Sequence, residues 1–198
     1  MRKVSSPLSD SVVKELRSGD EVAISGIIYT ARDEAHKRLF EAIKEKRRLP
    51  FDLSGQIIYY SGPTPTPPGK VIGSCGPTTA SRMDTWTPLL LKKGLRGMIG
   101  KGPRSKEVIK SIKEYKALYF AAWGGAGALL SKYVKKAELI AFKDLGPEAI
   151  YRLRVKNFPV IVINDVLGND LYRISTKSET LNSKQARMTE TCHCEGMK

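Results

Sequence analysis

Residues 73–84 combine glycines, hydroxyl side chains, a proline and an arginine in one short stretch. Pro77 suits the first position of a helix, so we predict a helix N-terminus there. The backbone N–H groups at such an end attract an anion. Thr78 and Arg82 are four residues apart, which would place both on one face of that helix. Because arginine binds a carboxylate through two parallel hydrogen bonds, the segment predicts a carboxylate pocket.

Two more basic side chains stand at the ends of predicted strands. Arg32 follows a strand predicted over residues 21–29, and Lys101 lies between two glycines that let a backbone approach a ligand closely. The alternatives stay open: surface ion pairs for Arg32 and Arg82, a solvated turn for Lys101, and glycines that serve only a tight turn. His36, one turn beyond Arg32, is either an acid/base or a helix residue that is hydrogen-bonded to a neighbour.

Strands and helices must alternate along the chain to position these residues. β-branched and aromatic runs predict strands at 21–29, 56–60, 95–99, 117–123 and 160–164. Helical spacing of apolar residues predicts helices over 32–48, from Ser105 onward, and ending near Tyr133. Residues 61–69 contain four prolines and predict a stiff extended loop. This alternation indicates an α/β fold with one compact domain over residues 1–172, followed by a loose basic tail over 173–198.

The composition suits a soluble globular protein. The chain has 198 residues, of which 41% are hydrophobic, so disorder throughout is excluded. No apolar run reaches the roughly 20 residues that a membrane span needs, and no apolar region follows the basic start as in a secretory signal. Three cysteines are too few for a disulfide framework, which agrees with a reducing compartment. We therefore expect a cytoplasmic protein.

The net charge of +14 attracts polyanions, anionic surfaces or small acidic metabolites. Half of this excess lies in residues 91–116, which carry nine basic and two acidic residues. This stretch lacks interleaved aromatic residues and matches no familiar nucleic-acid module, so a basic nucleic-acid-associated protein is a more distant alternative. A solvated face that resists aggregation also explains the charge.

Three other patterns fail on detail. The glycines at 125 and 127 lack the third glycine of a dinucleotide fingerprint, because Leu130 stands there. Cys192 and Cys194 flank a histidine in the tail, but no second pair of ligands completes a zinc site. Cys75 has no identifiable partner to orient it as a nucleophile.

Several ordered motifs with consistent spacing together support a family resemblance over about residues 8–172. They lie at residues 26–38, 60–65, 73–84, 98–102 and 165–170. With these motifs the chain resembles the β subunit, or C-terminal domain, of the iron-sulfur hydro-lyases of the class I fumarase and L-tartrate dehydratase family. The tail with Cys192 and Cys194 lies outside the resemblance.

The resemblance implies a swivelling β/β/α domain that completes an active site with an α subunit, in a heterodimer or heterotetramer. The four-iron four-sulfur cluster would be bound by that α subunit and not by this chain. Thr78 would be the catalytic base, Arg32 and Arg82 would bind the substrate carboxylates, and Lys101 would be a further substrate contact with a catalytic role.

The resulting expectation is a fumarate hydratase β subunit that interconverts fumarate and L-malate. L-tartrate dehydratase is the nearest alternative, because its substrate is also a four-carbon dicarboxylate. A partner with a purely structural role is a third possibility, and it would not need Arg32 or Arg82. The resemblance implies neither a nucleic-acid nor a membrane partner.

Overall fold

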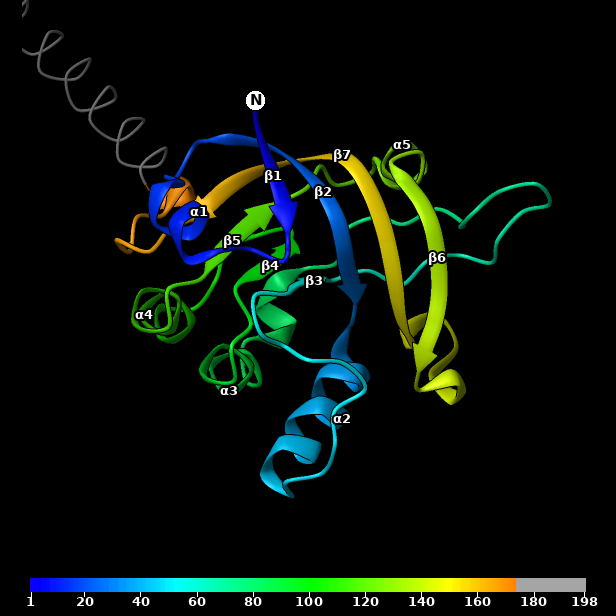
Figure 1. Ribbon diagram of the computed structural model, residues 1–198, viewed down its shortest axis with the longest axis horizontal. Helices are drawn as coiled ribbons and strands as arrows, with labels where there is room; N and C mark the ends of the chain where they lie inside the picture. Colours follow the sequence, from blue (N-terminus) through cyan, green and yellow to red (C-terminus); the bar gives the residue numbers. More distant parts are fainter. Residues whose placement is uncertain (174–198) are drawn as a thin grey trace, which may run out of the picture.

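A mixed sheet organises the computed structural model, which describes residues 1–173 (Figure 1). Its strands are β1 (Arg2–Ser6), β2 (Glu21–Thr30), β3 (Ile57–Tyr59), β4 (Gly97–Gly100), β5 (Leu118–Ala121), β6 (Val134–Ala141) and β7 (Ile150–Asn164). The helices are α1 (Asp10–Glu15), α2 (Asp33–Lys44), α3 (Thr87–Lys92), α4 (Lys106–Glu114) and α5 (Gly127–Ser131), with short 3₁₀ turns η1 (Ala80–Met83) and η2 (Lys143–Glu148). The predicted α/β class is confirmed.

Strand pairing closes the middle of the sheet into a ring. β2, β3, β4 and β5 are successive parallel neighbours, and the long antiparallel strand β7 pairs with both β5 and β2. β1 extends the sheet from β2, and β6 extends it from β7. Because the four ring strands from β2 to β5 are parallel, their carboxyl ends meet at one edge.

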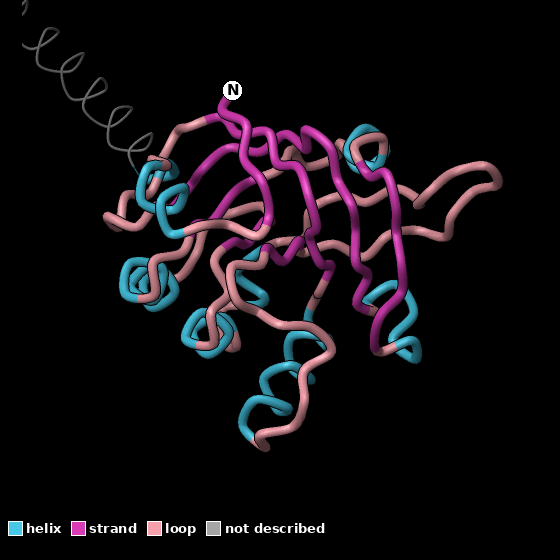
Figure 2. Tube along the Cα trace, in the orientation of Figure 1, coloured by secondary structure: helices cyan, strands magenta, loops and turns pink. Residues whose placement is uncertain are grey.

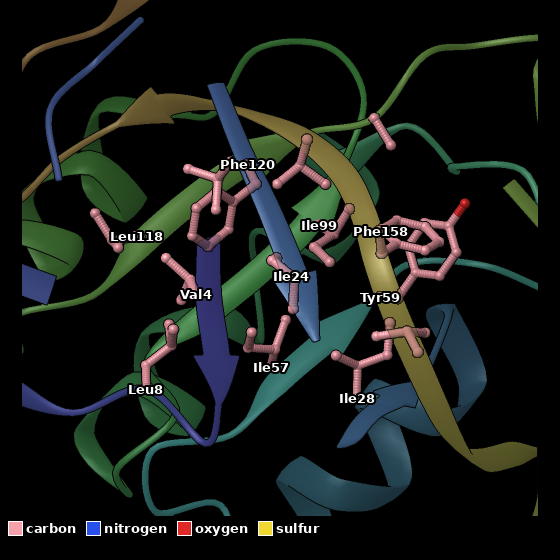
Figure 3. Close-up of a cluster of buried hydrophobic side chains, with 14 of the residues drawn as sticks. Val4, Leu8, Ile24, Ile28, Ile57, Tyr59, Ile99, Leu118, Phe120 and Phe158 are labelled. Carbon is pink, nitrogen blue, oxygen red and sulfur yellow. The ribbon is translucent and has the colours of Figure 1, made fainter. Parts of the chain in front are cut away.

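Alternating side chains give the sheet two buried faces. Ile57 and Tyr59 of β3 belong to a first cluster that draws residues from all five ring strands, among them Ile99 and Phe120 (Figure 3). The intervening Ile58 belongs to a second cluster, which the sheet shares with α2, α3 and α4. A strand buried on both faces reads as a continuous apolar run, and this explains the composition of β3.

Local signals in the sequence account for the starts of two helices. Ser105 caps α4, because its hydroxyl accepts a hydrogen bond from the Val108 N–H. Asp33 and Glu34 occupy the first turn of α2, where the helix dipole favours negative charge. Both helices were predicted, and α2, α3 and α4 lie together along one side of the sheet (Figure 2).

Sequence patterns missed β1, α1, α3 and β6. β6 is an edge strand that, among the strands in residues 1–173, pairs only with β7. Its apolar residues neither alternate strictly with polar ones nor form one continuous run. The first half of β7 was also missed, although buried Leu153 and Val155 alternate there with exposed Arg152 and Arg154, as in a half-buried strand. The prediction of a strand at 160–164 is confirmed as its buried end.

The predicted proline-rich loop is confirmed. Between β3 and η1 the chain runs out in a long loop that projects past β6 (Figure 1). The Thr64 N–H donates to the Ser74 carbonyl at 3.0 Å and so joins the two sides of the loop at its base. A Cβ atom at Gly73 would lie 2.1 Å from the Thr64 carbonyl oxygen, so only glycine permits this close approach.

None of the helices in residues 1–173 combines the length and apolar character that a membrane crossing needs. The predicted loose tail begins at Arg173, and the rest of it, with Cys192 and Cys194, lies outside the described residues.

His36 is a fully buried titratable group on α2. Its Nδ1–H donates to the Arg32 carbonyl at 2.9 Å, and its ring meets the Tyr60 ring edge-on. Its Nε2 has no hydrogen-bond partner among the described residues. Burial lowers the pKa of His36 to about 4, with the positive charge of Arg104 adding to the effect and the Arg32 carbonyl opposing it. The ring is therefore neutral at pH 7, as the helix-residue alternative requires.

We predict that His36 makes the protein less stable as pH falls from about 6.5 to about 4. In that window the unfolded chain binds a proton that the folded state excludes, so the free energy of unfolding decreases by up to roughly 3 kcal/mol. Urea unfolding of the wild type and His36→Phe at several pH values measures this. The variant should lose that part of the pH dependence; identical pH dependence in both proteins would refute the prediction.

Candidate active site at the carboxyl ends of the parallel strands

The parallel strands deliver the candidate residues to one edge of the sheet. Arg32 follows β2 after one intervening residue, and Lys101 follows β4 directly. β3 lies between these two strands and pairs with each of them. The topology therefore brings together side chains that are about seventy residues apart in the chain.

Residues 78–80 lie between the ends of β3 and β4 and pair with both. The Thr78 N–H donates to the Tyr60 carbonyl at 2.6 Å, and the Lys101 N–H donates to the Thr78 carbonyl at 3.1 Å. The Ala80 N–H in turn donates to the Lys101 carbonyl at 2.8 Å. Thr78 and Lys101 are thus held as neighbours by main-chain hydrogen bonds.

The predicted helix N-terminus at Pro77 is wrong. The first helical residue is Ala80, in the single turn η1, and Thr79 forms an isolated parallel bridge with Lys101. The strand ends beside it offer unpaired backbone groups, and bonding to them replaces the local bonds that a helix would need. Thr78 and Arg82 therefore do not share a helical face, and no helix N-terminus lies at Thr78.

Arg32 and Arg82 nevertheless meet, because one carboxylate lies between them. Arg82 Nε donates to Asp33 Oδ1 at 2.8 Å, and Arg32 Nη2 lies 3.8 Å from Asp33 Oδ2. Glu148, at the end of η2, is 3.4 Å from the same Arg32 nitrogen. Both arginines thus form ion pairs, as the alternative predicted, and they share Asp33 as a partner.

Lys101 differs from the two arginines. It is exposed, and no ion pair or side-chain hydrogen bond involves it within residues 1–173. A Cβ atom at Gly124 would lie 3.7 Å from Lys101 Cδ, so its stem runs beside the loop that follows β5. Its charge is therefore available to an anion at this edge.

Arg104 is a buried residue that supports the site. It was not predicted from the sequence. Its side chain is fully buried and forms a 2.8 Å ion pair with Asp84. Its terminal nitrogens donate to the Tyr60 hydroxyl at 3.0 Å and to the Thr87 hydroxyl at 2.8 Å. These contacts fix the turn after Lys101 to the residue that follows β3 and to the start of α3.

The sequence carried no signal for Arg104 or Glu148 as parts of a site. The residue type alone does not tell whether an arginine is buried or exposed, and the partners of Arg104 are distant in the chain. Asp33 could have been noticed because it follows Arg32 directly, but its contact with Arg82 spans 49 residues. Glu148 comes from the region that sequence patterns left unassigned.

Cys75 is not suited to nucleophilic chemistry. Its sulfur lies 3.1 Å from the Ser61 hydroxyl in the core, and burial raises the pKa of the thiol to about 11. A thiol with such a pKa stays protonated near neutral pH. Within residues 1–173 no three His, Cys, Asp or Glu side chains are grouped to hold a metal ion. The described residues therefore do not fit an iron-sulfur cluster.

The candidate residues lie on an open edge. Cavities of about 810 and 710 Å³ are lined by residues around 48–53 and around 64–74, and none of the four candidates contributes to either. Arg82 and Lys101 are exposed, whereas Arg32 and Thr78 are half-buried. A small acidic ligand would contact cations at this edge without being enclosed by the described residues.

Comparison with known proteins identifies the family of this chain. The family model described as "Fumarase C-terminus" matches residues 3–175. A protein of Methanocaldococcus jannaschii named "Putative L(+)-tartrate dehydratase subunit beta" is 42% identical, over 88% of this chain and 94% of its own length. "Fumarate hydratase 1, mitochondrial" of Leishmania major is 40% identical over 76% of this chain, and "Fumarate hydratase class I, anaerobic" of Escherichia coli is 36% identical over 81%.

The relatives differ in length. The chain spans almost all of the archaeal protein but only 28% and 30% of the two fumarate hydratases. The family match covers nearly every described residue, including Arg32, Thr78, Arg82 and Lys101. The resemblance seen in the sequence is confirmed: the chain belongs to the fumarase C-terminus family.

Proposed function

We propose that this chain is the β subunit of a two-subunit iron-sulfur hydro-lyase that interconverts fumarate and L-malate. The observation that carries the proposal is that two pairs lie at one edge of the sheet: Arg32 and Arg82, which share Asp33, and Lys101, which is hydrogen-bonded to Thr78 through the main chain. A four-carbon dicarboxylate needs cations for two carboxylates, and this edge supplies three. The family match and the names of the relatives support the same reaction class.

The two arginines bind and orient the substrate. Each charge-assisted contact to a carboxylate is worth about 1.5 to 3 kcal/mol. Arg32 is held by its acidic neighbours in the half-buried part of the site, while the exposed Arg82 reaches the open edge. Such fixed cations hold the reacting carbon at a constant position, which lowers the entropic part of the barrier.

Thr78 acts as the base toward the carbon next to the one that bears the hydroxyl group. A threonine hydroxyl is a weak base at neutral pH, so it needs nearby cations that favour its deprotonated form. Lys101 is the candidate for such a cation, because main-chain hydrogen bonds hold it next to Thr78. In the dehydration direction Thr78 takes the carbon-bound proton, and Lys101 stabilises the negative charge that builds on the adjoining carboxylate.

The partner would supply the cluster ligands that the described residues lack. The described residues hold no ligand set for an iron-sulfur cluster, so we assign the four-iron four-sulfur cluster to an α subunit. There it would provide Lewis-acid chemistry for the departing hydroxyl group. The open edge of the site and the greater length of the fumarate hydratases support a second chain that closes over the substrate. A cytoplasmic location stays a prediction.

L-tartrate dehydratase is the second candidate, and the name of the archaeal relative favours it. Anaerobic co-expression with a candidate α subunit, followed by assays on fumarate, L-malate and L-tartrate, separates the two. Turnover of fumarate and malate supports our proposal, whereas turnover of tartrate alone supports the second candidate. No activity on any of the three acids, with the complex assembled and the cluster present, would refute both.

We predict that Lys101→Met lowers kcat/KM of the assembled complex about ten- to a hundredfold, because one charge-assisted contact in the transition state is lost. Lys92→Met is the matched control. Lys92 is also exposed, but it ends α3, which precedes the amino end of β4 and so lies away from the site. Steady-state kinetics at equal cluster content measure both variants. Unchanged turnover in Lys101→Met would remove Lys101 from the mechanism.

We predict that Thr78→Ala lowers kcat at least about a hundredfold, as expected for loss of a general base, and leaves KM within a fewfold. Thr78→Ser should retain more activity because it keeps the hydroxyl group. Thr79→Ala is the neighbouring control, since Thr79 is exposed and joins the sheet through its backbone. A rise in KM with unchanged kcat would make Thr78 a binding group instead of a base.

A further inference from the structure

Asp33 contacts both arginines of the proposed site, although neither the family resemblance nor the sequence motifs gave it a role. It is the first residue of α2 and directly follows Arg32. Its Oδ1 accepts the hydrogen bond from Arg82 Nε at 2.8 Å, and its Oδ2 faces Arg32 Nη2 at 3.8 Å. One carboxylate is therefore shared by two cations that come from different parts of the chain.

The contact with Asp33 leaves one end of Arg82 unused. Asp33 occupies the Nε side of the guanidinium, and within residues 1–173 no hydrogen bond uses the two terminal nitrogens. The Arg82 side chain is 49% exposed, whereas that of Asp33 is only 20% exposed. When Nε of a guanidinium is hydrogen-bonded, its two Nη groups point away from that partner. These two Nη groups form one of the two edges through which arginine binds a carboxylate with two hydrogen bonds.

Arg32 is restrained on several sides. Its Nη2 lies between Asp33 and Glu148, and a Cβ atom at Gly62 would lie 2.9 Å from its Nη1. Glu148 also accepts a hydrogen bond from the Glu34 N–H through its second oxygen, so its position is set by the start of α2. The side chain of Arg32 consequently has little freedom to turn away from the site.

Asp33 keeps this arrangement at an energetic cost. Its Oδ2 is buried and forms no hydrogen bond among the described residues, as is also true of Arg32 Nε. Buried polar atoms without partners destabilise a fold, so a stabilising role alone accounts poorly for the pair. The position of Asp33 at the start of α2 compensates in part, because the helix dipole favours a carboxylate there.

We propose that Asp33 is a positioning residue that aims the Arg32 and Arg82 guanidiniums at the substrate carboxylates. The inference rests on the proposed function, since it takes the two arginines as ligands of a dicarboxylate. Its negative charge also offsets the charge of the arginines that it holds. Removing that charge should loosen the orientation of the arginines in the transition state while strengthening their general attraction for a dianion.

The test is the kinetics of Asp33→Asn in the assembled complex, with fumarate and L-malate as substrates. Asparagine keeps the size of the side chain and an acceptor oxygen but removes the charge. We expect kcat to fall about ten- to a hundredfold while KM stays equal or decreases. Asp33→Glu keeps the negative charge but has a longer side chain. Its kcat should therefore be higher than that of Asp33→Asn.

Glu34→Gln is the matched control. It removes one carboxylate from the same first turn of α2, but the exposed Glu34 side chain contacts neither arginine. It should leave kcat and KM within about twofold of the wild type, because the dipole contribution at this end of α2 is small. Thermal unfolding of each complex then corrects the rates for the folded fraction.

The outcomes separate this inference from the proposed function. A wild-type complex without activity on fumarate, malate or tartrate refutes the function, and the inference with it. An active wild type together with an Asp33→Asn variant of unchanged kcat refutes only the role of Asp33. If Asp33→Asn does not fold, Asp33→Ser, which also removes the charge, is compared with Glu34→Gln, and equal kcat in these two folded variants likewise overturns the inference.

Discussion

Main-chain pairing of residues 78–80 with the ends of β3 and β4 is the interaction on which the site depends. A sheet edge leaves backbone groups that must find partners, and here the partners come from the segment that carries Thr78. The same hydrogen bonds fix Lys101, because its N–H and its carbonyl both bond to that segment. Two side chains with proposed chemical roles are therefore positioned by backbone geometry and not by flexible contacts.

Electrostatics arranges the remaining cations. A protein with a net charge of +14 could attract a dianion over much of its surface, yet a binding site requires cations in fixed positions. Asp33 and Glu148 supply this constraint by neutralising and holding Arg32 and Arg82, and the buried Arg104 anchors the turn beyond Lys101. The site thus combines arginines held by ion pairs with Lys101, which has no ion pair within residues 1–173, at an edge that the described residues leave open.

Elements with a local physical signal were predicted correctly from the sequence. The apolar runs of β2 and β3, the spacing of α2 and the Ser105 cap were all recognised, because propensity and capping act over a few residues. The prediction of a helix at Pro77 was wrong. Local preference favoured a helix there, but residues 78–80 pair with the ends of distant strands instead. Sequence analysis also missed β6, whose apolar residues do not alternate strictly with polar ones and whose partner strand β7 follows only after an intervening turn.

The sequence by itself determined the α/β class, the family, and the identity of Arg32, Thr78, Arg82 and Lys101 as candidates, since these follow from residue types, spacing and motif resemblance. Only the tertiary structure decided how these residues meet. The closing of β7 against β2 and β5, the shared Asp33 and the buried Arg104 all join residues that are far apart in the chain. Such contacts depend on the packing of whole elements, and no local pattern records them.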